Sequence, residues 1–131
     1  MVEMNYPTHH KNGFTLIELL VAMTIIALLL SIVAPRYFNS ISKAEEAVLR
    51  EDLSLMRSAL DKYRADTGKY PDTLDELVNW KYLRKLPVDP ITKRADTWIV
   101  IPPAGSERGM VFDIRSGAQG RARDGTLYGD W

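Results

Sequence analysis

Hydrophobic and polar positions divide this chain into a continuous apolar stretch, a periodic stretch and a mixed remainder. From Phe14 to Ala34 there are 21 residues, and Glu18 is the only charged one. A helix of this length spans about 30 Å, the thickness of the hydrocarbon core of a bilayer. The pattern predicts a membrane-spanning helix over residues 14–35, with a single acid near its start.

Residues 36–66 show a helical period instead. The apolar positions recur every three or four residues, and they are Leu49, Leu53, Met56, Leu60 and Tyr63, extended by Ile41, Ala44 and Val48. Charged residues fill the opposite face, which is typical of a helix that covers a small core. Neither glycine nor proline occurs between Arg36 and Asp66. We therefore expect one helix from about residue 14 to residue 66, about 80 Å long.

Residues 67–131 are predicted to form a small globular head. Thr67-Gly68 ends the long helix, because glycine suits the position after a helix C-terminus. A short helix is expected at 73–78, and two antiparallel strands at 97–101 and 110–114. Two strands alone are marginal, so the hairpin must pack on the long helix in an α+β fold. Three further residues are expected to pack there: Trp80, Tyr82 and Leu83.

Composition removes several classes of function. The chain has 17 basic and 17 acidic residues, and this zero net charge argues against a nucleic-acid-binding surface. It has no cysteine, which excludes disulfides, thiolate metal ligands and a thiol nucleophile. Ser116 has no histidine available as a base, because both histidines lie in the N-terminal stretch. The sequence does not exclude a catalytic pair of carboxylates such as Asp89 with Asp113, but we predict no enzyme.

The N-terminal stretch gives weaker signals. His9-His10 suggests a metal site, but no other ligand is nearby in sequence, so we favour an ordinary polar segment. By the positive-inside rule, Lys11 places the N-terminus in the cytoplasm. Arg36 and Lys43, which follow the apolar segment, are also basic and weaken this assignment of orientation. The apolar segment is too long for a conventional cleaved signal peptide, which favours its retention.

Residues 13–20, Gly-Phe-Thr-Leu-Ile-Glu-Leu-Leu, resemble the type III signal of type IV pilins and type II secretion pseudopilins. The resemblance implies that residues 1–13 are a leader, which a prepilin peptidase removes after Gly13 on the cytoplasmic face. Phe14 then becomes the N-terminus and is N-methylated. The resemblance also implies a type IV pilin-like fold.

Glu18 fits this resemblance on physical grounds. A carboxylate inside a bilayer costs several kcal/mol unless it is paired. Its natural partner is the α-ammonium of Phe14, four residues earlier on the same helix face, which exists only after cleavage. The family implies pairing between neighbouring subunits of a filament. The alternative is an acid near the interface that reaches water.

Pro35 stands where related pilins often carry a proline. A proline inside a helix removes one backbone hydrogen bond and kinks it. The resemblance implies local melting there during filament assembly. The alternative is that the helix simply breaks at the membrane surface.

Motifs in the head narrow the resemblance further. Residues 67–71 and 86–90, Thr-Gly-Lys-Tyr-Pro and Leu-Pro-Val-Asp-Pro, are similar to those of the major, G-type pseudopilins of type II secretion. This implies a subunit that is anchored in the bacterial inner membrane and polymerises into a periplasmic filament driving secretion. The implied partners are further copies, other pseudopilins, the prepilin peptidase and the inner-membrane assembly platform. The alternative is a type IV pilin or minor pilin for adhesion, motility or DNA uptake. Many of those carry a C-terminal disulfide, which is impossible here.

The C-terminal stretch raises the question of calcium. In G-type pseudopilins a similar loop binds Ca²⁺ through oxygen ligands. The resemblance implies Gln119, Asp124 and Ser116 as candidate ligands, although Gln119 stands where an aspartate is expected. Arg121 and Arg123 add unfavourable charge. The favoured alternative is a loop without metal, closed by packing of Tyr128 and Trp131.

Overall fold

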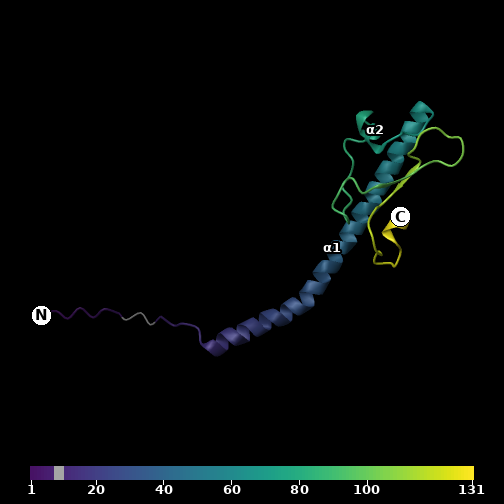
Figure 1. The fold of residues 1–131 in the computed structure, drawn as a ribbon. Helices are drawn as coiled ribbons and strands as arrows, with labels where there is room; N and C mark the ends of the chain where they lie inside the picture. Colours follow the sequence, from purple (N-terminus) through teal and green to yellow (C-terminus); the bar gives the residue numbers. More distant parts are fainter. Residues whose placement is uncertain (8–10) are drawn as a thin grey trace. The chain divides into compact units, whose positions relative to one another are not determined.

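The computed structural model describes residues 1–7 and 11–131 and divides into two compact units, Met1–Phe38 and Asn39–Trp131 (Figure 1). Helix α1 (Leu16–Thr67) contributes residues to both units. The first unit has neither helix nor strand over residues 1–7 and 11–15. The second unit contains the rest of α1 and the head.

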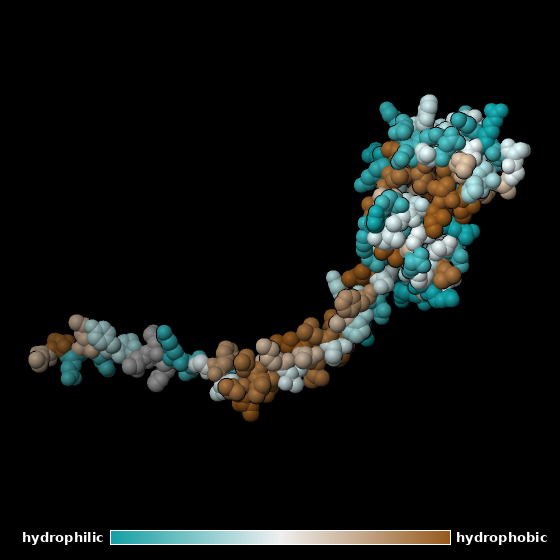
Figure 2. Space-filling model, in the orientation of Figure 1, coloured by the Kyte–Doolittle hydropathy of each residue, from teal (hydrophilic) through white to brown (hydrophobic). Residues whose placement is uncertain are grey.

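The apolar part of α1 is exposed along its length. It is the one helix among residues 1–7 and 11–131 that is long and apolar enough to cross a membrane, and none of its most apolar window is buried. Figure 2 shows these hydrophobic side chains covering its first part. Pro35 lies inside α1 without ending it, so the alternative of a simple helix break is wrong. A local bend at Pro35 stays a prediction.

The second part of α1 forms one wall of the core. Its buried residues are Leu49, Leu53, Met56, Ala59, Leu60 and Tyr63. The head supplies the opposite wall with Leu77, Leu83, Trp98, Val111 and Ile114. The predicted stripe is thus confirmed where the head covers it, and each fully buried leucine contributes about 2 kcal/mol. Its predicted extension is wrong: Ala44 is exposed, Ile41 is 37 % exposed and Val48 is 49 % exposed, because the head covers only one side of α1.

Helix α2 (Leu74–Asn79) agrees closely with the predicted short helix. Trp80 was expected on the long helix but is 68 % exposed. The reason is local. Helix α2 ends at Asn79, one residue before Trp80, and the chain then turns at Lys81, which has a positive φ of 63°. After this turn Tyr82 packs edge-on against Tyr63 at 5.4 Å, and Leu83 is buried as predicted.

Strands β1 (Ile99–Ile101) and β2 (Asp113–Arg115) form an antiparallel pair in which Val100 faces Ile114. Both strands are shorter than predicted, and residues 110–112 lie outside β2. The backbone N–H groups of Met110 and Val111 donate to the Pro71 carbonyl oxygen, at 3.1 and 2.9 Å. Pro71 is therefore the partner of residues 110–111, whereas the backbone N–H of Phe112 donates to the Ile101 carbonyl oxygen at 2.8 Å.

Candidate functional site

Helix α1 begins with a reciprocal cap between Thr15 and Glu18. The backbone N–H of Glu18 donates to Thr15 Oγ1 at 3.2 Å, and the backbone N–H of Thr15 donates to Glu18 Oε2 at 3.4 Å. This arrangement is a capping box, which satisfies two N–H groups at the helix start. The Thr-x-x-Glu spacing ahead of an apolar run is its known signature. The sequence therefore carried this signal, which neither the predicted pairing of Glu18 with the amine of Phe14 nor its alternative includes.

The predicted cleavage position lies just before the capped turn. Gly13 and Phe14 precede the helix, and Phe14 is 86 % exposed. Apart from Gly13 and its two chain neighbours, no atom of the described chain lies within 4 Å of the place where a Cβ on Gly13 would sit. The fold itself does not require glycine there, so any such requirement comes from a molecule that binds this segment. The predicted interpretation of His9-His10 lies outside the described residues.

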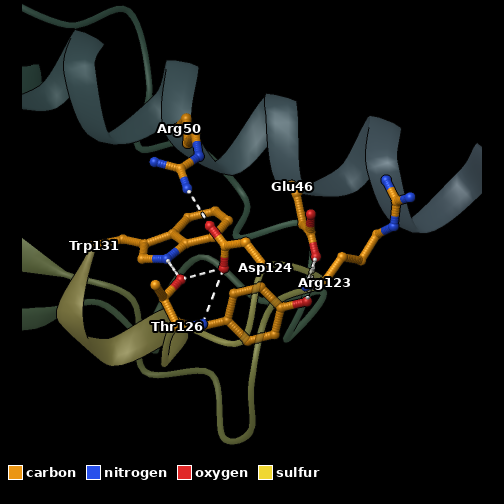
Figure 3. Close-up of polar contacts among 7 residues, drawn as sticks. Glu46, Arg50, Arg123, Asp124, Thr126 and Trp131 are labelled. Carbon is orange, nitrogen blue, oxygen red and sulfur yellow. Dashed lines mark hydrogen bonds and ion pairs between the residues drawn. The ribbon is translucent and has the colours of Figure 1, made fainter.

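Asp124, a candidate calcium ligand, already has protein donors at both oxygens (Figure 3). Its Oδ1 accepts hydrogen bonds from the Thr126 hydroxyl at 2.6 Å and from the Thr126 backbone N–H at 3.0 Å. Its Oδ2 lies 3.5 Å from the guanidinium of Arg50. The Thr126 hydrogen bonds, followed by the positive charge of Arg50, lower the pKa of Asp124.

Aromatic packing closes the C-terminal segment, as the favoured alternative predicted. The rings of Tyr128 and Trp131 meet edge-on at 5.3 Å. The indole Nε1–H of Trp131 donates to Thr126 Oγ1 at 2.7 Å, and the guanidinium of Arg50 lies 3.7 Å from the Trp131 ring centroid. Tyr128 begins a short 3-10 helix, η1 (Tyr128–Asp130).

Ser116, the second candidate ligand, is fully buried and serves the fold. Its hydroxyl donates to Asp89 Oδ2 and accepts from the Ala118 backbone N–H at 3.1 Å. Asp89 is fully buried as well, and its Oδ1 accepts from the backbone N–H groups of Ile91 and Thr92, at 2.8 and 3.2 Å. The chain thus uses this hydroxyl and carboxylate to join two loops.

The three candidate ligands do not converge on one point. Ser116 and Gln119 line a shallow hollow of about 200 Å³ whose one acid is Asp130, and Asp124 is not part of its lining. Within residues 1–7 and 11–131, no group of three His, Cys, Asp or Glu side chains is placed to hold a metal. Calcium prefers six to eight oxygen ligands with carboxylates among them. The residues present do not fit a calcium site.

The carboxylate of Asp113 is paired with an arginine and not with Asp89. Its Oδ1 accepts from Arg57 Nε at 2.9 Å, whereas Asp89 bonds to Ser116. The two acids engage different partners. The acidic pair that the sequence left open is therefore not formed.

These features together define a class of protein: a type IV pilin-like subunit, with an exposed apolar helix that continues into the core of a small α+β head. Comparison with known families agrees with this class. Residues 8–34 match the prokaryotic N-terminal methylation motif, and residues 36–126 match the type II secretion system (T2SS) protein G family. The chain belongs to the protein G family.

Several curated relatives carry the name type II secretion system core protein G. The relative from Pseudomonas aeruginosa is 36 % identical over 96 residues, which cover 61 % of this chain and 68 % of that protein. The relative from Klebsiella michiganensis is 29 % identical over 137 aligned residues, covering 92 % of this chain and 93 % of that protein. The relative from Vibrio cholerae is 28 % identical, with 92 % of both chains covered. No solved structure matches the chain.

Proposed function

We propose that this chain is a pseudopilin, a membrane-anchored structural subunit that polymerises into a periplasmic pseudopilus and drives type II secretion. The match of residues 36–126 to the protein G family carries the proposal. It covers the head, whereas the N-terminal signal is common to all pilin-like proteins. For this reason it favours secretion over the alternative of a type IV pilin or minor pilin.

The N-terminal segment supports a route of maturation. A prepilin peptidase cuts after Gly13 at the cytoplasmic face, and Phe14 is N-methylated. The match to the methylation motif and the exposed, non-helical backbone at Gly13 support this step. The helix then holds the subunit in the inner membrane, with the head in the periplasm. Partners are further copies, other pseudopilins and the inner-membrane assembly platform.

Glu18 has a different role before and after cleavage. In the uncut chain it caps the backbone of Thr15. Cleavage creates an ammonium group at Phe14, four residues before Glu18; Phe14 lies outside α1 in the uncut chain, so a shared helix face for the two residues stays a prediction. A carboxylate in an apolar filament core is costly unless paired, and an amine on a neighbouring subunit provides that pairing. Charge, rather than capping, is then what assembly needs.

Variants at the cap separate these two roles. Glu18→Gln keeps the cap, because glutamine serves equally in a capping box, but removes the charge. Glu18→Val removes both, and Thr15→Ala weakens the cap while keeping the charge. We expect all three to be cleaved, and only Thr15→Ala to assemble. The measurement is immunoblotting of filaments released from the periplasm of cells that express the secretion genes. Normal filaments from Glu18→Gln would refute the charge pairing and leave capping as the role of Glu18.

The intact mass of the membrane-extracted protein tests maturation directly. Loss of residues 1–13 with one added methyl group is the expected result, and Gly13→Asp is expected to keep the full mass. Secretion is tested separately by deleting the gene and assaying exported proteins in the medium. Normal export combined with lost twitching motility would support the type IV pilin alternative instead.

A further inference from the structure

We propose that the C-terminal segment, residues 116–131, is fixed to α1 by a clamp of three side chains, Glu46, Arg50 and Arg57, and needs no calcium. The three residues lie four and seven positions apart, so they share one face of the helix. Together they contact the segment through its backbone, its acid and its aromatic side chains. The inference concerns the head alone and is independent of the secretion role.

Glu46 binds the C-terminal segment at two residues, Arg123 and Tyr128. Its Oε1 accepts the backbone N–H of Arg123 at 2.8 Å and the hydroxyl of Tyr128 at 3.2 Å (Figure 3). One carboxylate oxygen thus joins two points of the segment to α1. Hydrogen bonds that involve a charged group are stronger than neutral ones.

Arg50 occupies the place where a cation would neutralise Asp124. Its guanidinium lies 3.7 Å from the centroid of the Trp131 ring and 3.5 Å from Asp124 Oδ2. A guanidinium over an indole face is attracted by the negative face of the ring. The arginine therefore supplies the positive charge and the packing surface at once.

Arg57 ties the end of the segment to the sheet. Its NH2 group donates to the backbone oxygens of Trp131, at 2.8 Å, and Ile114, at 2.9 Å. Its Nε donates to Asp113 at 2.9 Å. One planar side chain therefore joins α1, β2 and the last residue, which a guanidinium does well because its donors are fixed in a fork.

The positively charged arginines in and around the segment disfavour the binding of a divalent cation. Arg121 donates to the Gly125 carbonyl oxygen at 2.8 Å, so a backbone oxygen of the turn also has a cationic partner. Calcium would have to displace Arg50 from Asp124 and come close to these arginines. Like charges at short range repel even in a high-dielectric surface environment. The arginines here supply the positive charge that a bound cation would otherwise provide.

Thermal unfolding of the full chain in detergent micelles tests both halves of the inference. The melting temperature is measured in EGTA and at about 10 mM calcium, which exceeds the Kd of weak extracellular calcium sites, about 10⁻⁴–10⁻³ M. We expect no shift between the two. Glu46→Ala and Arg50→Ala are each expected to lower the melting temperature. Each should also speed hydrogen exchange at the Ala122 amide, which lies inside the segment and donates to the Thr126 carbonyl oxygen at 2.7 Å. Lys62→Ala, on the same helix outside the clamp, is the control.

Two results would overturn the inference. A saturable rise in the melting temperature with calcium would show that the segment binds the ion. Unchanged exchange at Ala122 in both clamp variants would show that the clamp does not fix the segment. Arg57→Ala removes three hydrogen bonds and is a more severe variant, but the test does not depend on its folding, because Glu46 and Arg50 report independently.

Discussion

The buried Asp89–Ser116 pair offers the sharpest test of how the head is held together. Asp89 is 0 % exposed and accepts hydrogen bonds from the Ser116 hydroxyl and from two backbone N–H groups. Asp89→Ala leaves these three donors without their acceptor. Ser116→Ala leaves two groups without this partner, the backbone N–H of Ala118 and Asp89 Oδ2. The first change should be the more damaging, because three donors lose their acceptor.

The magnitude follows from the number of donors. Each unsatisfied buried donor costs about 1–3 kcal/mol. Asp89→Ala also removes the cost of burying a carboxylate, which offsets part of the total cost of the three donors. We expect Asp89→Ala to destabilise the head by about 3 kcal/mol and Ser116→Ala by about 1–2 kcal/mol. For a domain of this size, about 3 kcal/mol lowers the melting temperature by about 12–24 °C. Asp89→Asn keeps the shape and should fall in between.

The assay is thermal unfolding of the full chain in micelles, followed by tryptophan fluorescence. Trp98 is a suitable reporter because it is buried and its indole N–H donates to the Pro87 carbonyl oxygen at 2.9 Å. Asp96→Ala is the control, since Asp96 sits in an exposed pair with Arg94. The double variant completes a cycle whose coupling should exceed about 1 kcal/mol. The reasoning is refuted if Asp89→Ala melts like Asp96→Ala, or if the coupling is absent.

Two further predictions concern charge and close packing. Burial, with added negative charge from Asp89 and Glu51, raises the pKa of Asp52 above its unfolded value of 3.8. Ionised Asp52 therefore costs stability at neutral pH, and this cost disappears as pH falls below 3.8. Asp52→Asn should raise the melting temperature at pH 7 but not below 3.8, and an equal gain at both would contradict the cause. Gly109 has φ of 97° and an added Cβ would lie 2.1 Å from the Tyr70 carbonyl oxygen, whereas Gly105 has φ of 83° and open space. Gly105→Ala should cost about 1 kcal/mol in urea unfolding and Gly109→Ala clearly more, and equal costs would mean that contact with Tyr70 is unimportant.

The sequence by itself determined the long helix, the stripe that enters the core and the family signal. These depend on neighbours within a turn or two, such as the recurrence of Leu49, Leu53 and Met56, which any helix brings to one face. The capping box of Glu18 was also readable, because Thr15 lies three residues away. Local spacing was sufficient for each of these features.

Only the tertiary structure decided which polar groups meet. Ser116 bonds to Asp89 across 27 positions, and Arg57 reaches Trp131 across 74. The strands are short because residues 110–111 bond to Pro71, and Trp80 is exposed because Lys81 turns the chain. No periodicity encodes such pairings, since they depend on loops that the core brings together. The bond to Asp89 also engages the Ser116 hydroxyl that the sequence alone had offered to calcium.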